Sequence, residues 1–274
     1  MFVMLVLLLI PLLMTLALSL GQLNDAGDMY LVGLSNYSAV LGDPRYLNAL
    51  GFTLLYILVS IPIHTLLGFL LALSLDQLPR WSHNIVISLL AMPFVMTPIV
   101  GTLIFSWLFK DYFGLFPWLL GQVGVHVDWL GKVWPARWTL FLWGIWWSTG
   151  FNVMVLFAGL QTLDRDQLHA AEIDGASGAQ QLRHIIMPHM LPFFVLITTF
   201  NLMDSYRIFD NVYVMTRGGP GTSTETLEFY NYQLSFVLHD LGGGAAVSML
   251  DVAGILFLLV PLLIYSARLR RVEK

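Results

Sequence analysis

Six long blocks of apolar residues constrain the fold of this chain more than any other feature of its sequence. A helix needs about 20 mostly apolar residues to cross the hydrocarbon core of a bilayer. The blocks cover residues 1–20, 47–75, 85–109, 138–163, 190–214 and 245–265. Because the bilayer core offers no water to the backbone, such blocks cross it as helices. The sequence therefore predicts an all-α integral membrane protein with about six transmembrane helices, in one domain over residues 1–274.

The charge content excludes most classes of soluble protein. Charged residues make up 11% of the 274 residues, against about 25% in an average soluble domain. This supply cannot cover the surface of a globule, and it offers no basic face for nucleic acid. The chain contains no cysteine, which removes disulfides, thiolate metal sites and thiol catalysis. A protein surrounded by membrane lipids is the class that remains.

Basic residues in the short loops predict the orientation of the chain. The tail and the loops on its side carry Arg80, Arg165, Arg183, Arg268, Arg270, Arg271 and Lys274. The opposite loops carry Arg45, Lys110, Lys132, Arg137 and Arg217. By the positive-inside rule, the basic tail places both termini in the cytoplasm. The first block has no basic residue before it, as a secretory signal would, so we expect it to be an uncleaved helix.

A polar stretch between the fourth and fifth blocks predicts a helical hairpin. It covers Asp164–Pro188 and reads DRDQLHAAEIDGASGAQQLRHIIMP. Asp164 can cap a first helix, and Asp174-Gly175 favours a turn because glycine accepts positive φ. Ser177 can cap a second helix, which Pro188 is expected to end before the fifth span. Composition alone favours an interfacial helix pair that only joins two spans.

The residue order in this hairpin resembles the EAA loop of binding-protein-dependent ABC importers, in particular the membrane subunits of the sugar-importing, maltose-type group. The match is Ala170-Ala171-Glu172-Ile173-Asp174-Gly175-Ala176-Ser177, then Ile185-Ile186-Met187-Pro188 and Pro192. In that family the loop forms a coupling helix that docks in a groove of a cytoplasmic ATPase. The resemblance implies ATPase contacts at His169, Ala170, Ala171, Glu172, Asp174, Gly175, Ala176 and Pro188. The family usually has glutamate at position 169, so His169 is either a substitute contact or a tolerated interfacial residue.

A second segment is similar to the signature of the first of the two permease subunits in sugar importers. It consists of Arg207–Thr216, Gly218-Gly219-Pro220 and Thr224-Glu225-Thr226. Partial matches occur at Val32–Tyr37 and Asp43-Pro44-Arg45, so the resemblance runs from about residue 32 to the end. From the residues alone, Gly-Gly-Pro-Gly predicts a sharp turn just outside the membrane.

The sequence lacks the motifs that would indicate a phosphate-binding loop, a metal site or a catalytic nucleophile. Gly218–Thr224 has no lysine and Gly131-Lys132 is followed by valine, so neither is a Walker A phosphate loop. The seven histidines are scattered without metal-ligand spacing, and there is no nucleophile elbow. We therefore expect no catalytic residue, metal site or cofactor in this chain. The resemblance implies that ATP and Mg are used by a separate ATPase subunit.

Charged residues within a span are costly and mark either a transport pathway or a paired structural site. Asn201, Asp204, Ser205 and Ile208 share one predicted helical face, where they could bind sugar hydroxyls. Alternatively, Asp204 pairs with Arg207 one turn on. The resemblance favours cargo, because the matching positions in maltose-type permeases contact sugar at mid-membrane.

The same resemblance assigns a second set of pathway residues to the fourth span, namely Gly144, Trp147, Ser148 and Phe151. Trp147 and Phe151 lie four residues apart and could form an aromatic platform for a pyranose ring, or simply pack against neighbours. Asp251 in the sixth span has no counterpart in the family pattern. It could cap a polar network with Arg207 or face a water-filled vestibule.

Together these matches imply one transmembrane subunit of a type I ABC importer, which moves a sugar or related polyol by alternating access. The implied partners are a second homologous permease, two ABC ATPase subunits and a periplasmic or lipid-anchored solute-binding protein, all at the cell (inner) membrane. One alternative is a glycerol-phosphate-type importer, for which Arg207 is the only intramembrane base. Another is a proton-coupled secondary transporter that uses Asp204, Asp210 and Asp251.

Overall fold

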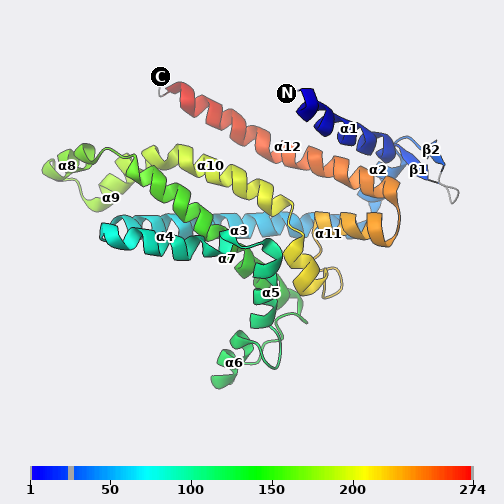
Figure 1. The fold of residues 1–274 in the computed structure, drawn as a ribbon, viewed down its shortest axis with the longest axis horizontal. Helices are drawn as coiled ribbons and strands as arrows, with labels where there is room; N and C mark the ends of the chain where they lie inside the picture. Colours follow the sequence, from blue (N-terminus) through cyan, green and yellow to red (C-terminus); the bar gives the residue numbers. More distant parts are fainter. Residues whose placement is uncertain (1, 24–27, 273–274) are drawn as a thin grey trace. The chain divides into compact units, whose positions relative to one another are not determined.

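The computed structural model describes residues 2–23 and 28–272, and most of them are helical (Figure 1). The strands in the described residues form one short antiparallel hairpin of β1 (Gly21–Leu23) and β2 (Met29–Leu31), with Gln22 opposite Tyr30. The all-α class predicted from the apolar blocks is confirmed.

The helices follow one another with short connections. In chain order the α-helices are α1 (Phe2–Ser19), α2 (Ser35–Gly42), α3 (Pro44–Asp76), α4 (Arg80–Val95), α5 (Pro98–Leu108), α6 (Leu115–Gln122), α7 (Val133–Gln161), α8 (Arg165–Ile173), α9 (Gly178–Gln181), α10 (Met187–Tyr206), α11 (Leu227–Tyr232) and α12 (Leu241–Val272). Three π-helical turns are η1 (Leu182–Ile186), η2 (Val212–Thr216) and η3 (Gln233–Val237).

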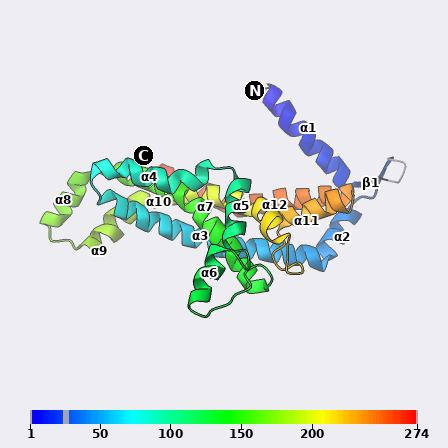
Figure 2. The ribbon, with the colours of Figure 1, turned by 60° about the horizontal axis from the view of Figure 1, so that its bottom comes forward.

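The chain divides into two compact units, which are described separately below. The first unit contains residues 1–56, 106–140 and 206–258. The second unit contains residues 57–105, 141–205 and 259–274. Figures 1 and 2 show α8 and α9 together at one end of the second unit, beyond α10.

Four helical stretches in the described residues are long and apolar enough to cross a bilayer: Pro44–Asp76, Val133–Gln161, Gly178–Tyr206 and Leu241–Arg268. The stretch predicted as the third span is broken, because α4 and α5 meet at an angle of 96°. Pro98 starts α5 without a backbone donor and disfavours helical geometry at the residue before it. If this bent pair is one span, five crossings result.

The first predicted span corresponds to α1, whose described apolar part, Leu5–Ser19, is shorter than the four long helices. Its predicted first residue, Met1, lies outside the described residues, as does Lys274 of the basic tail. The expected count of about six spans thus compares with four or five long crossings and this shorter helix.

The prediction that Pro188 ends the second hairpin helix is wrong. The helix continues from Gly178 to Tyr206 through α9, η1 and α10. In η1, directly before the proline, the Met187 amide donates to the carbonyl of Leu182, which widens the turn. Such local π adjustments let neighbouring groups satisfy the backbone that a proline leaves unpaired, so the helix need not stop.

The fifth span ends earlier than the predicted boundary at residue 214. α10 stops at Tyr206, so Arg207 and Asp210 lie beyond this helix rather than inside it. The reason is local: the Thr226 hydroxyl donates to the carbonyl of Ile208 at 2.8 Å, in place of a helical donor. Asn211 then accepts from the Val212 amide at 2.8 Å with its side chain, next to the start of η2.

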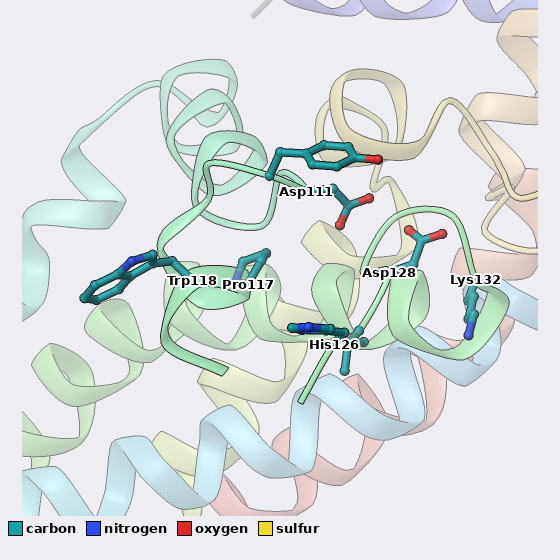
Figure 3. A pocket seen from close by; sticks show the side chains of 8 residues that line it. Asp111, Pro117, Trp118, His126, Asp128 and Lys132 are labelled. Atoms are coloured by element: carbon teal, nitrogen blue, oxygen red, sulfur yellow. The ribbon is translucent and has the colours of Figure 1, made fainter. Parts of the chain in front are cut away.

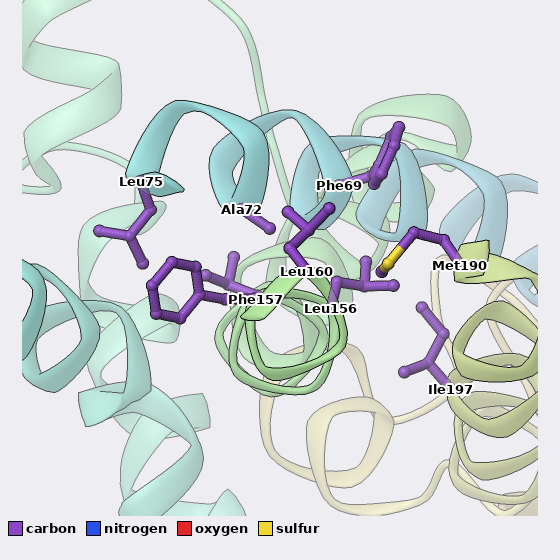
Figure 4. Close-up of a cluster of buried hydrophobic side chains, with 9 residues drawn as sticks. Phe69, Ala72, Leu75, Leu156, Phe157, Leu160, Met190 and Ile197 are labelled. Carbon is purple, nitrogen blue, oxygen red and sulfur yellow. The ribbon is translucent and has the colours of Figure 1, made fainter. Parts of the chain in front are cut away.

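The core of the second unit is an apolar cluster contributed by three helices (Figure 4). Its members are Phe69, Ala72 and Leu75 of α3, Val153, Leu156, Phe157 and Leu160 of α7, and Met190 and Ile197 of α10. Their three- and four-residue spacing places them on one stripe of each helix. Small residues let the helices approach closely: a Cβ on Gly159 would lie 2.8 Å from the ring of Phe193.

In the first unit, two motifs that are far apart in the sequence bind each other. Arg45 donates from Nε and Nη2 to the two carboxylate oxygens of Glu225, both at 2.8 Å. The Glu225 side chain is 1% exposed and that of Arg45 is 37% exposed, so this bidentate pair is largely shielded from water. The hydroxyl of Tyr230 also donates to Asp43 at 2.7 Å. The Thr224-Glu225-Thr226 signature is therefore a clamp that holds α11 to the start of α3.

Arg45→Ala tests this clamp. Removal of the guanidinium leaves the buried Glu225 carboxylate without its charged partner, and we expect it to lower the free energy of unfolding by about 3 kcal/mol. The matched control is Arg207→Ala, because the side chain of Arg207 is 73% exposed and its Nε lies 3.8 Å from Glu228. Exposed pairs of this kind contribute about 1 kcal/mol or less. Unfolding of the detergent-solubilised protein should separate the variants, and equal losses would contradict the assignment.

Candidate functional site

The predicted hairpin between α7 and α10 forms from the residues expected to cap and turn it. Asp164 accepts from the amide of Asp166 at 3.0 Å and caps α8. Gly175 adopts a φ of +78°, which an L side chain rarely tolerates, and supplies the turn. The Gln180 side chain accepts from the amide of Ser177 at 2.7 Å and closes the start of α9.

The hairpin exposes side chains in the described structure rather than burying them. Ile173, at the end of α8, is 87% exposed. His169 and Glu172 also face solvent, and their side chains approach to 3.6 Å between Nδ1 and Oε2. Ala170, Gly175 and Pro188 are exposed as well. The hairpin therefore presents a mixed apolar and polar surface that is available to another molecule.

Hydrogen bonds anchor the base of the hairpin to the ends of the long helices. Asp76, the last residue of α3, accepts from Arg165 of α8 at 2.6 Å and from Gln161 of α7 at 2.8 Å. The bond to Asp76 raises the pKa of the Arg165 guanidinium above its ordinary value. On the other side, Thr162 Oγ1 lies 3.0 Å from Nε2 of His189 in α10. Three transmembrane helices thus meet at the point where the hairpin begins.

Sequence reasoning missed this anchor. Asp76 and Arg165 are opposite charges that follow two different spans, and that placement at the same side of the membrane was the only available signal. Which acid would meet which base depends on the packing of α3 against α7, which the sequence pattern does not specify.

The residues predicted on the fourth span lie among aromatic side chains of the second unit, with Trp147 buried and Phe151 half-buried. The Trp147 ring stacks on that of Trp143 at 5.3 Å and 8°. Phe151 stacks on Phe94 of α4 at 5.2 Å, and the same Phe94 ring lies 6.4 Å from Trp147. Gly144 and Ser148 are buried beside them. Trp147 and Phe151 are therefore joined through Phe94, in one aromatic cluster.

Asn201 belongs to a buried chain of polar groups across three helices. Its side-chain amide donates to Asn152 of α7 at 2.9 Å, and the Asn152 amide donates to Nδ1 of His64 in α3 at 2.7 Å. All three side chains are buried. Asn152 and His64 were not among the predicted site residues, although polar side chains within apolar blocks are a signal for such a network.

The other residues that were predicted to share one helical face with Asn201 do not lie together in the structure. Ser205 is buried and Asp204 is exposed, both on the last turns of α10 in the second unit. Ile208 lies beyond the end of α10 and belongs to the first unit. Asn201 and Ser205 are thus buried on α10, whereas the early end of the helix removes Ile208 from the predicted helical face.

Asp251 of α12 is 8% exposed in the first unit. Among the described residues, neither of its carboxylate oxygens has a hydrogen-bond partner. A Cβ on Gly254, one turn further, would lie 2.2 Å from the Tyr206 hydroxyl, so that hydroxyl rests against the same part of α12. The predicted network partner, Arg207, instead has its Nε 3.8 Å from Glu228.

Comparison with known proteins identifies several relatives of similar length. The chain is 34% identical over 237 residues to a probable ABC transporter permease, y4oQ, of Sinorhizobium fredii, which covers 86% of this chain and 76% of that one. It is 31% identical over 252 residues to the trehalose/maltose transport system permease MalF of Thermococcus litoralis, with coverage of 90% and 84%. It is 30% identical over 247 residues to the sn-glycerol-3-phosphate transport system permease UgpA of Agrobacterium fabrum, with coverage of 89% and 81%.

A solved structure has the same fold. The chain matches a subunit of a bacterial ABC transporter involved in the import of the acidic polysaccharide alginate, with a TM-score of 0.84 and 17% identity. The match covers 100% of this chain and 93% of the other. At this identity the likeness concerns the fold alone.

The family match covers most of the chain and includes the hairpin and the polar and aromatic residues of α7 and α10. Residues 31–274 match the family of binding-protein-dependent transport system inner membrane components. Its members are multi-pass permeases of the inner membrane, which are non-catalytic, bind no cofactor and work with a separate ATPase. The chain belongs to this family and is the permease of a binding-protein-dependent ABC importer.

Proposed function

We propose that this chain is the first-type permease of an ATP-driven importer for a sugar or related polyol. The observation that carries the proposal is the exposed hairpin, whose base is bound to transmembrane helices through Asp76 and Arg165. A surface on which another subunit exerts force must be exposed, and it must also be rigidly linked to the helices that move. The relationship to a trehalose/maltose permease supports a sugar as cargo.

The hairpin is the coupling element in this proposal. An ABC ATPase docks on α8 through His169, Glu172 and the exposed Ile173. When ATP closes the ATPase dimer, movement of α8 passes to α3 through Asp76. It also passes to α10, because the helix is continuous from Gly178 to Tyr206. The importer then needs two ATPase subunits, a second homologous permease and an external solute-binding protein that delivers the cargo.

This docking fixes the orientation of the chain. An ATPase is cytoplasmic, so the hairpin lies on the cytoplasmic side of the membrane. If α10 and α12 each cross once, the C-terminus returns to the same side. The basic residues Arg165 and Arg183 of the hairpin agree with this placement under the positive-inside rule. The N-terminus lies on this side as well when six crossings are counted.

The cargo pathway is lined by the polar and aromatic residues of α7 and α10. Asp204 offers carboxylate oxygens at the surface of its unit, and Ser205 and Asn201 continue the polar side of α10. On α7, Trp147 and Ser148 are buried and Phe151 is half-buried in this structure, so their aromatic faces and hydroxyl meet the cargo only when the pathway opens. Carboxylate and amide oxygens accept hydrogen bonds from hydroxyls, and an aromatic face covers the C–H face of a sugar ring. Both contacts suit a neutral, hydroxylated solute.

Glycerol phosphate is the second candidate cargo, favoured by the relationship to UgpA. A phosphate calls for arginine or lysine side chains that are free to bind it. Arg207 lies beyond α10 and its Nε is 3.8 Å from Glu228, which offsets its charge. A neutral sugar therefore fits the described residues better. A proton-coupled carrier using Asp204, Asp210 and Asp251 remains distinguishable, because it would transport solute without an ATPase.

Gly175→Pro tests the hairpin as the coupling element. Proline fixes φ near −65° and cannot adopt the +78° of Gly175, so we expect ATP-driven maltose uptake by the complete reconstituted complex to be abolished. Gly178→Ala is the matched control, since a Cβ there meets nothing within 4 Å and uptake should be retained. Uptake that survives Gly175→Pro would remove the hairpin from the coupling pathway.

Arg165→Ala tests the anchor at the base of the hairpin. Loss of the charged hydrogen bond to Asp76, worth about 1.5 kcal/mol, should lower the amount of solute transported per ATP hydrolysed by about tenfold. Hydrolysis by the ATPase subunits should continue. Arg183→Ala, an exposed arginine of the same hairpin, is the control. If uptake and hydrolysis fall in the same proportion, the anchor does not transmit movement.

Asp204→Ala tests the cargo pathway. A hydrogen bond to a charged group contributes about 1.5–3 kcal/mol, so the apparent affinity in sugar-stimulated ATP hydrolysis should weaken by about 10- to 100-fold. Met203→Ala, the exposed neighbour on α10, is the control and should change little. The measurement uses the complete complex with its binding protein. An unchanged affinity in Asp204→Ala would exclude this carboxylate from the pathway.

A further inference from the structure

The connection between α5 and α7 folds around its own small aromatic core in the first unit. Phe109 is buried and stacks on Phe116 of α6 at 4.5 Å and 19°. The same ring meets Trp129 edge-on at 5.1 Å and 70°. Aromatic pairs in these geometries contribute about 0.5–1.5 kcal/mol beyond their burial. Phe109 therefore fixes two stretches of chain, residues 111–118 and 126–132, relative to each other.

Both stretches are shaped by short local hydrogen bonds. The Gly114 amide donates to the carbonyl of Lys110 at 2.7 Å and closes a tight turn. A Cβ on Gly114 would lie 2.5 Å from that carbonyl oxygen, so the turn requires glycine. It leaves Tyr112 fully exposed, with a φ of +71° that is rare for an aromatic residue. In the second stretch, Asp128 accepts from the Gly131 amide at 2.7 Å.

Between these stretches lies a half-open pocket of about 560 Å³ (Figure 3). Six of its lining residues carry polar or aromatic groups: Asp111, Tyr112, Trp118, His126, Asp128 and Lys132. A pocket of this volume lies within the range that holds small organic ligands. None of these residues belongs to the proposed pathway on α7 and α10 or to the hairpin at residues 164–188.

The charges that line the pocket select against ions. The lining carries two carboxyl groups, Asp111 and Asp128, and one lysine, Lys132. Burial together with the neighbouring Asp128 raises the pKa of Asp111. The carboxyl pair repels phosphate or sulfate, while a single lysine gives such an anion only one firm partner. A metal ion is also disfavoured, because the described residues contain no group of three or more potential ligands. What remains is a balanced set of hydrogen-bond donors and acceptors beside aromatic rings.

We propose that this pocket is a binding site for a neutral saccharide or polyol, separate from the pathway on α7 and α10. The Asp111 and Asp128 oxygens accept hydrogen bonds from ligand hydroxyls, and Lys132 and His126 donate to ligand oxygens. Tyr112 or Trp118 covers the C–H face of a sugar ring. Along the chain, the 29 residues of α7, which are long and apolar enough to cross a membrane, separate this pocket from the coupling hairpin.

Binding can be measured on the full chain in lipid nanodiscs by saturation-transfer NMR, with maltose, sorbitol and glucose 6-phosphate as probes. We expect maltose to bind, and the double variant Asp111→Asn/Asp128→Asn to weaken its binding by about tenfold, as the loss of charged hydrogen bonds predicts. Asparagine can still accept from the Gly131 amide, so the fold of the stretch is kept. Trp118→Ala and Tyr112→Asn should also weaken binding, since asparagine tolerates the positive φ.

Two controls make the result specific. Phe113→Ala removes an exposed aromatic ring that does not line the pocket, and it should leave maltose binding unchanged. The double variant should weaken maltose binding by the same factor in the Asp204→Ala background as in the wild type, so a failure of this pocket is distinguishable from a failure of the proposed cargo pathway. Equal maltose binding in the wild type and the double variant would overturn the proposal. So would the absence of maltose binding, or tighter binding of glucose 6-phosphate than of maltose.

Discussion

The carboxylate of Asp76 joins the exposed hairpin to the helices that cross the membrane. It accepts from Arg165 at 2.6 Å and from Gln161 at 2.8 Å, so the end of α3, the end of α7 and the start of α8 share one acceptor. Charge-assisted hydrogen bonds of this length are about twice as strong as neutral ones. Without this junction, no side-chain bond among the described residues would join α8 to α3, and force applied to α8 would have no direct route into α3.

A continuous helix is the second link between the hairpin and the transmembrane helices. The helix that starts at Gly178 runs to Tyr206 without interruption, because η1 accommodates the proline that follows it. Further along this helix, Asn201 joins Asn152 and, through it, His64. A buried amide in a membrane bundle needs a partner, so these bonds fix how α10 sits against α7 and α3 within the second unit. The second helix of the hairpin and the proposed cargo residues Asn201, Asp204 and Ser205 therefore lie on one continuous helix.

The hairpin could be predicted from the sequence because its signals are local. Asp164 caps α8, Gly175 turns the chain and Ser177 begins α9 at the expected positions. The family resemblance was equally accessible, since it rests on contiguous residues. The predicted helix end at Pro188 is wrong for a physical reason. Helix propensity alone predicts that a proline ends a helix, whereas a π turn next to Pro188 lets the helix continue.

Contacts between distant segments could not be predicted in this way. The signature around Glu225 was recognised as a pattern, but its partner Arg45 is 180 residues away and only the folded first unit brings them together. The same holds for His64 and Asn152, which are 88 residues apart. The exclusion of Ile208 from the α10 face depended on Thr226, another distant residue. Sequence patterns specify which residues are polar, but packing decides which of them meet.

A double-mutant cycle at the Asp76–Arg165 junction tests the coupling account most directly. Solute transported per ATP hydrolysed is measured for the complete reconstituted complex with Asp76→Ala, Arg165→Ala and both substitutions together. If the junction transmits movement, either single substitution removes the link, and the double variant loses no more than the single variants do. Losses that add independently, or a transport ratio that none of the three variants changes, would contradict the account.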